Sequence, residues 1–226
     1  DLAVDLDVDY LALSFVRRAA DVLELKQALA DKDARQLVVA KIEKAEALVD
    51  VDAIIDAADA VMVARGDLGV EIPPAQVPIW QKHIIRKCVE AGRPVITATQ
   101  MLQSMVSAPR PTRAEANDVA NAIYDATDAV MLSAETAVGT YPLEAVGTMA
   151  QIATTIEADI EQNGWAPQPW ALRASGIPDA IGFGACDVAR KTGARALVTA
   201  TASGATARAV AKHRPLQPIV AVSPDP

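Results

Sequence analysis

Eight polar or charged side chains stand at or just after the ends of five short apolar runs, and their types suit chemistry on an anionic substrate. They are Ser14, Lys41, Glu43, Arg65, Asp67, Thr99, Ser133 and Glu135. Glu43 and Asp67 follow adjacent runs with no histidine or cysteine nearby, and such an oxygen-only set suits Mg²⁺ or Mn²⁺. A lysine beside such a cation can neutralise a phosphoryl group during transfer.

The segment from Arg65 to Gly69 adds an anion-binding feature, because Gly66 and Gly69 would let backbone amides approach a ligand closely. For any one of the charged residues, simple solvation at a strand end is an equally good interpretation. For all five runs together it is a poor one, because a lysine and several carboxylates that converge must neutralise something. The residues alone therefore predict metal-dependent chemistry on a small phosphorylated or carboxylated substrate.

The apolar runs predict strands that are buried on both faces, as in a parallel sheet covered by helices. They span residues 10–15, 37–43, 60–64, 94–99 and 129–133. The runs recur about every thirty residues, which is the length of one strand–helix unit. A barrel is favoured over an open doubly wound sheet, because polar residues recur at every strand end rather than at one switch point.

Helix signals fall between these runs. Thr112 and Glu115 form a capping box, which predicts a helix that starts at Thr112. Trp80, Ile84 and Cys88 share one helical face, and Gly92 supplies the stop.

The pattern changes near residue 162, where a segment rich in Gly, Pro and Trp predicts a linker. Beyond it the sequence predicts a helix, a strand, a second helix and a second strand, at residues 177–192, 196–201, 206–212 and 218–222. We therefore expect a barrel-type domain over 1–162, a linker over 163–172 and an incomplete α/β domain over 173–226.

Composition excludes several classes of function. The formal charge of the 226 residues is −8, whereas nucleic-acid binding needs a concentrated basic face. Cys88 and Cys186 lie far apart inside apolar patterns, which predicts neither a disulfide framework nor a metal site and favours the reducing cytoplasm. Charged residues interrupt every apolar run, so we expect no membrane span, and no signal peptide is visible.

Seven longer stretches resemble the central motifs of pyruvate kinase. In chain order they are residues 13–17 (LSFVR), 39–44 (VAKIEK), 62–71 (MVARGDLGVE), 96–102 (ITATQML), 109–115 (PRPTRAE), 118–122 (DVANA) and 131–136 (MLSAET). They occur in family order, with family-like spacing. The resemblance implies strands 4 to 8 of a (β/α)8 barrel, followed by part of a C-terminal α/β regulatory domain. It implies the glycolytic transfer of a phosphoryl group from phosphoenolpyruvate to ADP, giving pyruvate and ATP.

The resemblance also implies roles for particular residues. Lys41 would contact the phosphoryl group in flight, while Glu43 and Asp67 would hold the divalent cation. The backbone amides of Gly66 and Asp67, with the Thr99 hydroxyl, would hold the substrate carboxylate.

Further residues have weaker implied roles. Ser133 and Glu135, together with Thr99, would lie near the water that protonates the enolate carbon. Arg65 would belong to the substrate-binding loop, or orient the metal ligands together with Ser14.

The implied partners are phosphoenolpyruvate or pyruvate, ADP or ATP, Mg²⁺ or Mn²⁺, K⁺ and further copies of the chain in a homotetramer. The potassium ligands would lie in the family's first three strands, which have no counterpart here. Arg113 and Glu115 would serve a subunit interface or simply cap a helix. In the second domain, the phosphate of an allosteric effector would bind the loop that contains Thr201, Ser203, Gly204 and Thr206. An ordinary helix N-cap by Ser203 or Thr206 is the alternative.

Two other functions stay open on the sequence. The chain could be a truncated, catalytically incompetent fragment that acts only through association. It could also be a metal-dependent lyase or aldolase acting on pyruvate enolate, although Lys41 would then have no phosphoryl group to meet.

Overall fold

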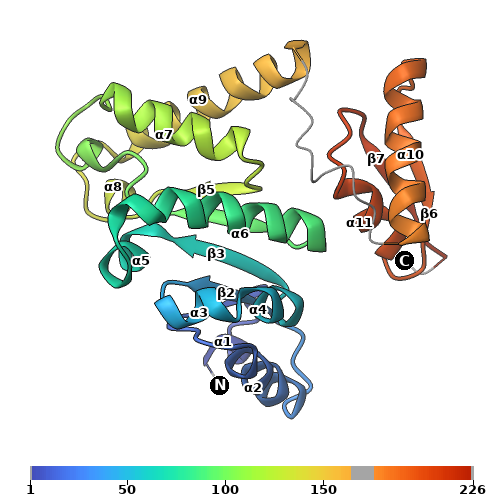
Figure 1. The fold of residues 1–226 in the computed structure, drawn as a ribbon, viewed down its shortest axis with the longest axis horizontal. Helices are drawn as coiled ribbons and strands as arrows, with labels where there is room; N and C mark the ends of the chain where they lie inside the picture. Colours follow the sequence, from blue (N-terminus) through green and yellow to red (C-terminus); the bar gives the residue numbers. More distant parts are fainter. Residues whose placement is uncertain (1, 164–175, 225–226) are drawn as a thin grey trace. The chain divides into compact units, whose positions relative to one another are not determined.

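The computed structural model describes residues 2–163 and 176–224 of the chain (Figure 1). The chain divides into two compact units, Asp1–Asn163 and Gly164–Pro226. Of the predicted linker at 163–172, only Asn163 lies within the described residues, and it ends a helix of the first unit.

The first unit is built on a five-stranded sheet whose order follows the sequence. Its strands are β1 Tyr10–Leu13, β2 Leu37–Ile42, β3 Ala60–Ala64, β4 Val95–Ala98 and β5 Ala129–Met131. All four neighbouring pairs are parallel. Consecutive strands are therefore neighbours throughout, with no switch in direction, as in a (β/α)8 barrel rather than a doubly wound sheet. The expectation of a partial barrel is confirmed.

Helices connect the strands, because parallel neighbours need a crossover. α1 Leu2–Asp5 precedes the sheet. The connections then hold α2 Ala19–Ala30, α3 Ala45–Val49, α4 Val51–Ala57, α5 Arg65–Glu71, the 3₁₀ turn η1 Pro74–Gln76, α6 Val77–Ala91, the 3₁₀ turn η2 Gln103–Val106 and α7 Arg113–Tyr124. α8 Ala134–Ala137 and α9 Pro142–Asn163 follow the last strand (Figure 1).

The predicted helix signals at α6 and α7 are confirmed. The Thr112 side chain accepts a hydrogen bond from the Glu115 amide, and the Glu115 carboxylate accepts one from the Thr112 amide. At the end of α6, Gly92 adopts the left-handed conformation at φ 64°. Ile84 and Cys88 on the predicted apolar face of α6 are fully buried.

An apolar layer lies beneath the end of the sheet where the polar residues gather. It consists of Val39, Ala60, Met62 and Ala98, from three adjacent strands. Side chains alternate between the faces of a strand, so Lys41 emerges from the same face as Val39, one step closer to the strand end. A second cluster fixes the segment that follows β4; it contains Met101, Leu102, Met105, Val119, Ala122, Ala145 and Met149.

The second unit contains α10 Ile177–Thr192, β6 Leu197–Ala200, α11 Ala205–Ala211 and β7 Ile219–Val222. The two strands are parallel. All four elements match their predicted positions to within one residue at every boundary. Buried Asp179 on α10 pairs with Lys212 and His213 at 2.8 Å each, which ties α10 to the end of α11. Among the described helices of both units, none is long and apolar enough to cross a membrane.

Candidate active site

The polar residues at the strand ends meet at one edge of the sheet, because every strand points the same way. Lys41 on β2 shows this directly: its Nζ donates to Ser14 Oγ beyond β1 at 2.8 Å. The same nitrogen lies 3.2 Å from Glu43 Oε2. Lys41 and Glu43 are two positions apart, so their side chains share a face of the chain.

Glu43 is buried, with only 2% of its surface exposed, and a hydrogen bond and an ion pair fix its carboxylate. Its Oε1 accepts the backbone N–H of Phe15 at 2.5 Å, which leaves Oε2 directed toward Lys41. Phe15 can present its amide in this way because it adopts a left-handed conformation, at φ 59°. An aromatic residue seldom takes that conformation, so the backbone at Phe15 is strained. The strained conformation directs the Phe15 amide at the Glu43 carboxylate.

Asp67 supplies the second carboxylate, from the first turn of α5 just beyond β3. Because β2 and β3 are paired neighbours, Glu43 and Asp67 follow adjacent strand ends. Asp67 is exposed, and among the described residues no hydrogen bond or ion pair engages its carboxylate.

These two carboxylates fit a magnesium-type cation. In the part of the chain that the structure describes, no group of three or more His, Cys, Asp and Glu side chains gathers for a metal. A site with two protein carboxylates leaves the remaining positions to water and substrate oxygens, which is the usual arrangement for Mg²⁺. Oε2 of Glu43 faces a lysine and, among the residues that the structure describes, accepts no backbone amide, so it is the oxygen that could turn to a cation.

The structure brings Gly66 and Thr99 together, with the Gly66 amide bonded to Thr99 rather than open to the predicted substrate carboxylate. The Gly66 amide donates to Thr99 Oγ1 at 2.7 Å, and the Thr99 hydroxyl donates to the carbonyl of Ala98 at 2.6 Å. The approach is close: a Cβ on residue 66 would come within 3.2 Å of Thr99 Oγ1. A carboxylate bound here would accept the hydrogen bond that the Thr99 hydroxyl now donates to the Ala98 carbonyl.

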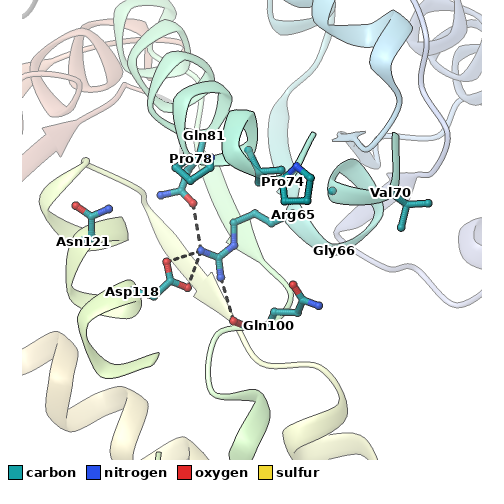
Figure 2. A pocket seen from close by; sticks show the side chains of 11 residues that line it. Arg65, Gly66, Val70, Pro74, Pro78, Gln81, Gln100, Asp118 and Asn121 are labelled. Carbon is teal, nitrogen blue, oxygen red and sulfur yellow. Dashed lines mark hydrogen bonds and ion pairs between the residues drawn. The ribbon is translucent and has the colours of Figure 1, made fainter. Parts of the chain in front are cut away.

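The guanidinium group of Arg65 is directed at protein groups (Figure 2). It donates to Asp118 at 2.8 Å, to Gln81 at 3.2 Å and to the carbonyls of Thr99 and Gln100 at 2.8 and 3.3 Å. The residue is 9% exposed. This arrangement favours the second of its two predicted roles, that of orienting the site, over direct contact with substrate.

Glu135 is another buried carboxylate that binds the backbone. It is 1% exposed, and its two oxygens accept the amides of Leu102 at 3.1 Å and Ser133 at 2.8 Å. Glu135 thus joins the end of β5 to the segment after β4. Ser133 itself is exposed at this edge, so its hydroxyl remains accessible to water.

A cavity of about 450 Å³ lies beside the Arg65 cluster, between α5, η1, α6 and α7 (Figure 2). Its walls include Val70, Pro74, Pro78, Gln81 and Asn121. Lys41 and Glu43 do not line it, so it adjoins the predicted catalytic edge from the Arg65 side.

Several residues that shape the site are not predictable from the sequence. Asp118 was visible only as part of a motif, and Gln81 only as a polar residue within an amphipathic helix. Neither position carries a sequence signal that predicts its bond to Arg65. The left-handed backbone of Phe15, Thr99 and Gln100 was equally hidden, because none of them is a glycine.

Comparison with known proteins assigns the family. The family model for the pyruvate kinase barrel domain matches residues 1–146, and the model for the pyruvate kinase alpha/beta domain matches residues 179–226. The chain belongs to the pyruvate kinase family. It is 54% identical to the pyruvate kinase of Geobacillus stearothermophilus over 217 residues, which are 96% of this chain and 37% of that protein. It is 48% identical to the pyruvate kinase of Clostridium acetobutylicum, again over 96% of this chain and over 46% of the relative.

A solved structure agrees with this assignment. The crystal structure of a pyruvate kinase from Cryptosporidium parvum superposes with a TM-score of 0.86 at 40% identity, covering 98% of this chain and 46% of that one. The chain thus spans less than half the length of these pyruvate kinases.

Two other predictions for this member of the family concern helix starts. Glu115 accepts hydrogen bonds from both Ser104 and Thr112, which confirms its capping role; Arg113 is exposed, and an interface role for either residue stays a prediction. At α11 the alternative of a side-chain cap by Ser203 or Thr206 is wrong.

Gly204 caps α11 through its left-handed backbone at φ 77°, and no side chain accepts there. Arg208 folds back over the same turn and donates to the Ser203 carbonyl at 2.9 Å. Effector binding by Thr201, Ser203, Gly204 and Thr206 stays a prediction.

Proposed function

We propose that this chain supplies the metal-binding and phosphoryl-binding side of a pyruvate kinase active site. The reaction is the transfer of the phosphoryl group of phosphoenolpyruvate to ADP, which yields ATP and the enolate of pyruvate. The observation that carries the proposal is the Lys41–Glu43 pair, at 3.2 Å, with exposed Asp67 at the neighbouring strand end. It combines a cationic side chain with two carboxylate ligands, as phosphoryl transfer requires.

Each of the charged site residues has a defined role in that reaction. Lys41, now shared between Ser14 and Glu43, would neutralise the equatorial oxygens of the phosphoryl group in flight. Glu43 and Asp67 would hold Mg²⁺ or Mn²⁺, which supplies further charge neutralisation when bound. Lys41 lies against both Ser14 and Glu43, so it would remain beside the metal ligands while it contacts the phosphoryl group.

The substrate carboxylate would lie at the start of α5. The Asp67 amide and the Thr99 hydroxyl would donate to it, while the Gly66 amide keeps Thr99 Oγ1 in place. Exposed Ser133 would hold the water that delivers a proton to the enolate carbon, and Glu135 would fix the loop that carries Ser133. The expectations of K⁺, a homo-oligomer and regulation through the second unit rest on the family resemblance alone. The expected cytoplasmic location rests on the two widely separated cysteines.

A coupled assay for pyruvate formation tests the proposal. The purified chain is assayed with phosphoenolpyruvate, ADP, Mg²⁺ and K⁺. It is also assayed as a replacement for the matching segment of the Geobacillus stearothermophilus relative. We expect turnover in the chimaera that Lys41→Ala abolishes, whereas Lys82→Ala, which breaks a surface ion pair with Asp125, leaves it intact.

The rival functions give different results. A chimaera that folds but forms no pyruvate would refute the proposal and leave the incompetent-fragment hypothesis. Proton exchange into pyruvate without nucleotide, undiminished in Lys41→Ala, would instead support a lyase or aldolase.

A further inference from the structure

Two consecutive residues of the site, Thr99 and Gln100, adopt left-handed backbone conformations at φ 69° and 53°. A β-branched residue rarely takes that conformation, and two non-glycine residues in succession need support from the surrounding structure. β4 fixes the chain up to Ala98, and the apolar cluster that holds Met101 and Leu102 fixes it from residue 101 onward. Contacts made directly to Thr99 and Gln100 can add support between these two anchors.

Arg65 provides that support. Its Nη2 donates to both strained residues, at 2.8 Å to the Thr99 carbonyl and at 3.3 Å to the Gln100 carbonyl. Its Nη1 donates to Asp118 at 2.8 Å and to Gln81 at 3.2 Å. One planar group thus spans the turn after β4 and two helices, a geometry that a lysine could not reproduce.

The strained turn decides where the Thr99 hydroxyl lies. That hydroxyl accepts a hydrogen bond from the Gly66 amide at 2.7 Å and donates one to the Ala98 carbonyl. A bound ligand could accept the second hydrogen bond in place of Ala98. If Thr99 relaxed to the ordinary negative φ, its side chain would swing away from Gly66. The position of the Thr99 hydroxyl therefore depends on the backbone conformation of the turn.

We propose that Arg65, held by Asp118, is a positioning residue that keeps Thr99 and Gln100 left-handed and so places the Thr99 hydroxyl for the substrate carboxylate. The part that concerns substrate rests on the proposed function. The part that concerns backbone conformation does not, and it can be measured on this chain alone.

Hydrogen exchange and backbone couplings test the conformational part. In Arg65→Lys and Arg65→Ala we expect the Gly66 amide to exchange about tenfold faster or more, as for the loss of a charge-assisted hydrogen bond. The couplings of Thr99 and Gln100 should shift away from positive φ. Arg93→Ala is the matched control, because Arg93 donates to one carbonyl, that of Asp56, outside the site.

The adjoining cavity allows a rescue experiment. Removal of the Arg65 side chain opens the cavity of about 450 Å³ toward the two carbonyls. Millimolar guanidinium ion should therefore restore slow Gly66 exchange in Arg65→Ala but change nothing in Arg93→Ala. If Gly66 and the two couplings are unaltered in Arg65→Lys while the amides of β3 and α6 stay protected, the proposal is overturned.

A double-mutant cycle tests the kinetic part in the chimaera with the Geobacillus stearothermophilus relative. Arg65→Lys should raise the KM for phosphoenolpyruvate about tenfold and leave the KM for ADP unchanged. In a Thr99→Val background, which lacks the hydroxyl, the same change should have little further effect. Fully additive effects would show that Arg65 does not act through Thr99. A chimaera without turnover would overturn the proposed function, while the exchange result would still decide the conformational inference.

Discussion

Two glycines of the first unit differ in what surrounds them, and alanine should affect them in opposite directions. At Gly66 the added methyl group would meet Thr99 Oγ1 at 3.2 Å, and Thr99 cannot retreat because both its backbone and its hydroxyl are fixed. At Gly147, inside α9, nothing lies within 4 Å. We expect Gly66→Ala to destabilise by about 1–3 kcal/mol and Gly147→Ala to stabilise by up to about 1 kcal/mol. Urea unfolding of both variants measures this, and equal effects would contradict it.

The Glu43 carboxylate should dominate cation affinity. Glu43→Gln keeps an oxygen for the Phe15 amide but removes the charge that faces Lys41. We expect Mn²⁺ affinity, measured by titration calorimetry on the chain, to fall at least about tenfold. Glu46→Gln is the control, because Glu46 is exposed and lies 4.0 Å from Arg17 in a weak surface pair. Equal affinity in both variants would remove Glu43 from the metal site.

At the scale of elements, the start of α7 depends on one hydroxyl and one carboxylate. Thr112 caps the helix that carries Asp118, the partner of Arg65. Thr112→Ala should lower the free energy of unfolding by about 1 kcal/mol. Thr154→Ala should change it by less than about 0.5 kcal/mol, since the Thr154 hydroxyl only donates back to its own helix. Thermal or urea unfolding compares the two, and a neutral Thr112→Ala would show that the cap is dispensable.

The same cap predicts a dependence on pH. Burial raises the pKa of Glu115, but hydrogen bonds from Ser104 and Thr112 outweigh it, so the pKa lies below its ordinary value. A carboxyl group with a lowered folded pKa stabilises the protein above its unfolded pKa of about 4.3, and this contribution is lost as pH falls through the folded pKa. The stability difference between the wild type and Glu115→Gln should therefore shrink from pH about 6 to about 3. A constant difference would contradict the assignment.

The elements were largely predictable, whereas their exact connections at the site were not. Each strand is a short apolar run, and burial on both faces leaves β3 no polar residue at all, so periodicity and composition sufficed. Predicted strand ends such as Thr99 and Glu43 fall outside β4 and β2, because their side chains or backbones turn to bind other groups. The hydrogen-bond acceptors of Arg65 are set by distances across the fold, and no spacing in the sequence predicts them.

At the scale of the whole molecule, the sheet of the first unit has two open sides. Among the described residues β1 pairs only with β2, and β5 only with β4. Unpaired strand edges favour association, and a lysine on the edge opposes it. We expect the isolated chain to self-associate, and exposed Ala12 on β1, when changed to lysine, to shift association to higher concentration. Sedimentation velocity over a concentration series measures this.

The control for the edge is Ala30→Lys, which adds the same charge to an exposed position of α2. It should leave the association constant unchanged. If both lysine variants weaken association equally, net charge rather than strand pairing drives it.

The two cysteines provide a separate labelling probe for each unit. Cys88 on α6 is fully buried, Cys186 on α10 is half-buried, and burial raises the pKa of both thiols. Because only the thiolate is nucleophilic, neither reacts with maleimide quickly while its surroundings stay closed. Labelling at residue 88 therefore reports openings of the first unit, whereas labelling at half-buried residue 186 has a slow rate in the folded second unit that rises when this unit opens, so the native chain reports on each of its two halves without any engineered site.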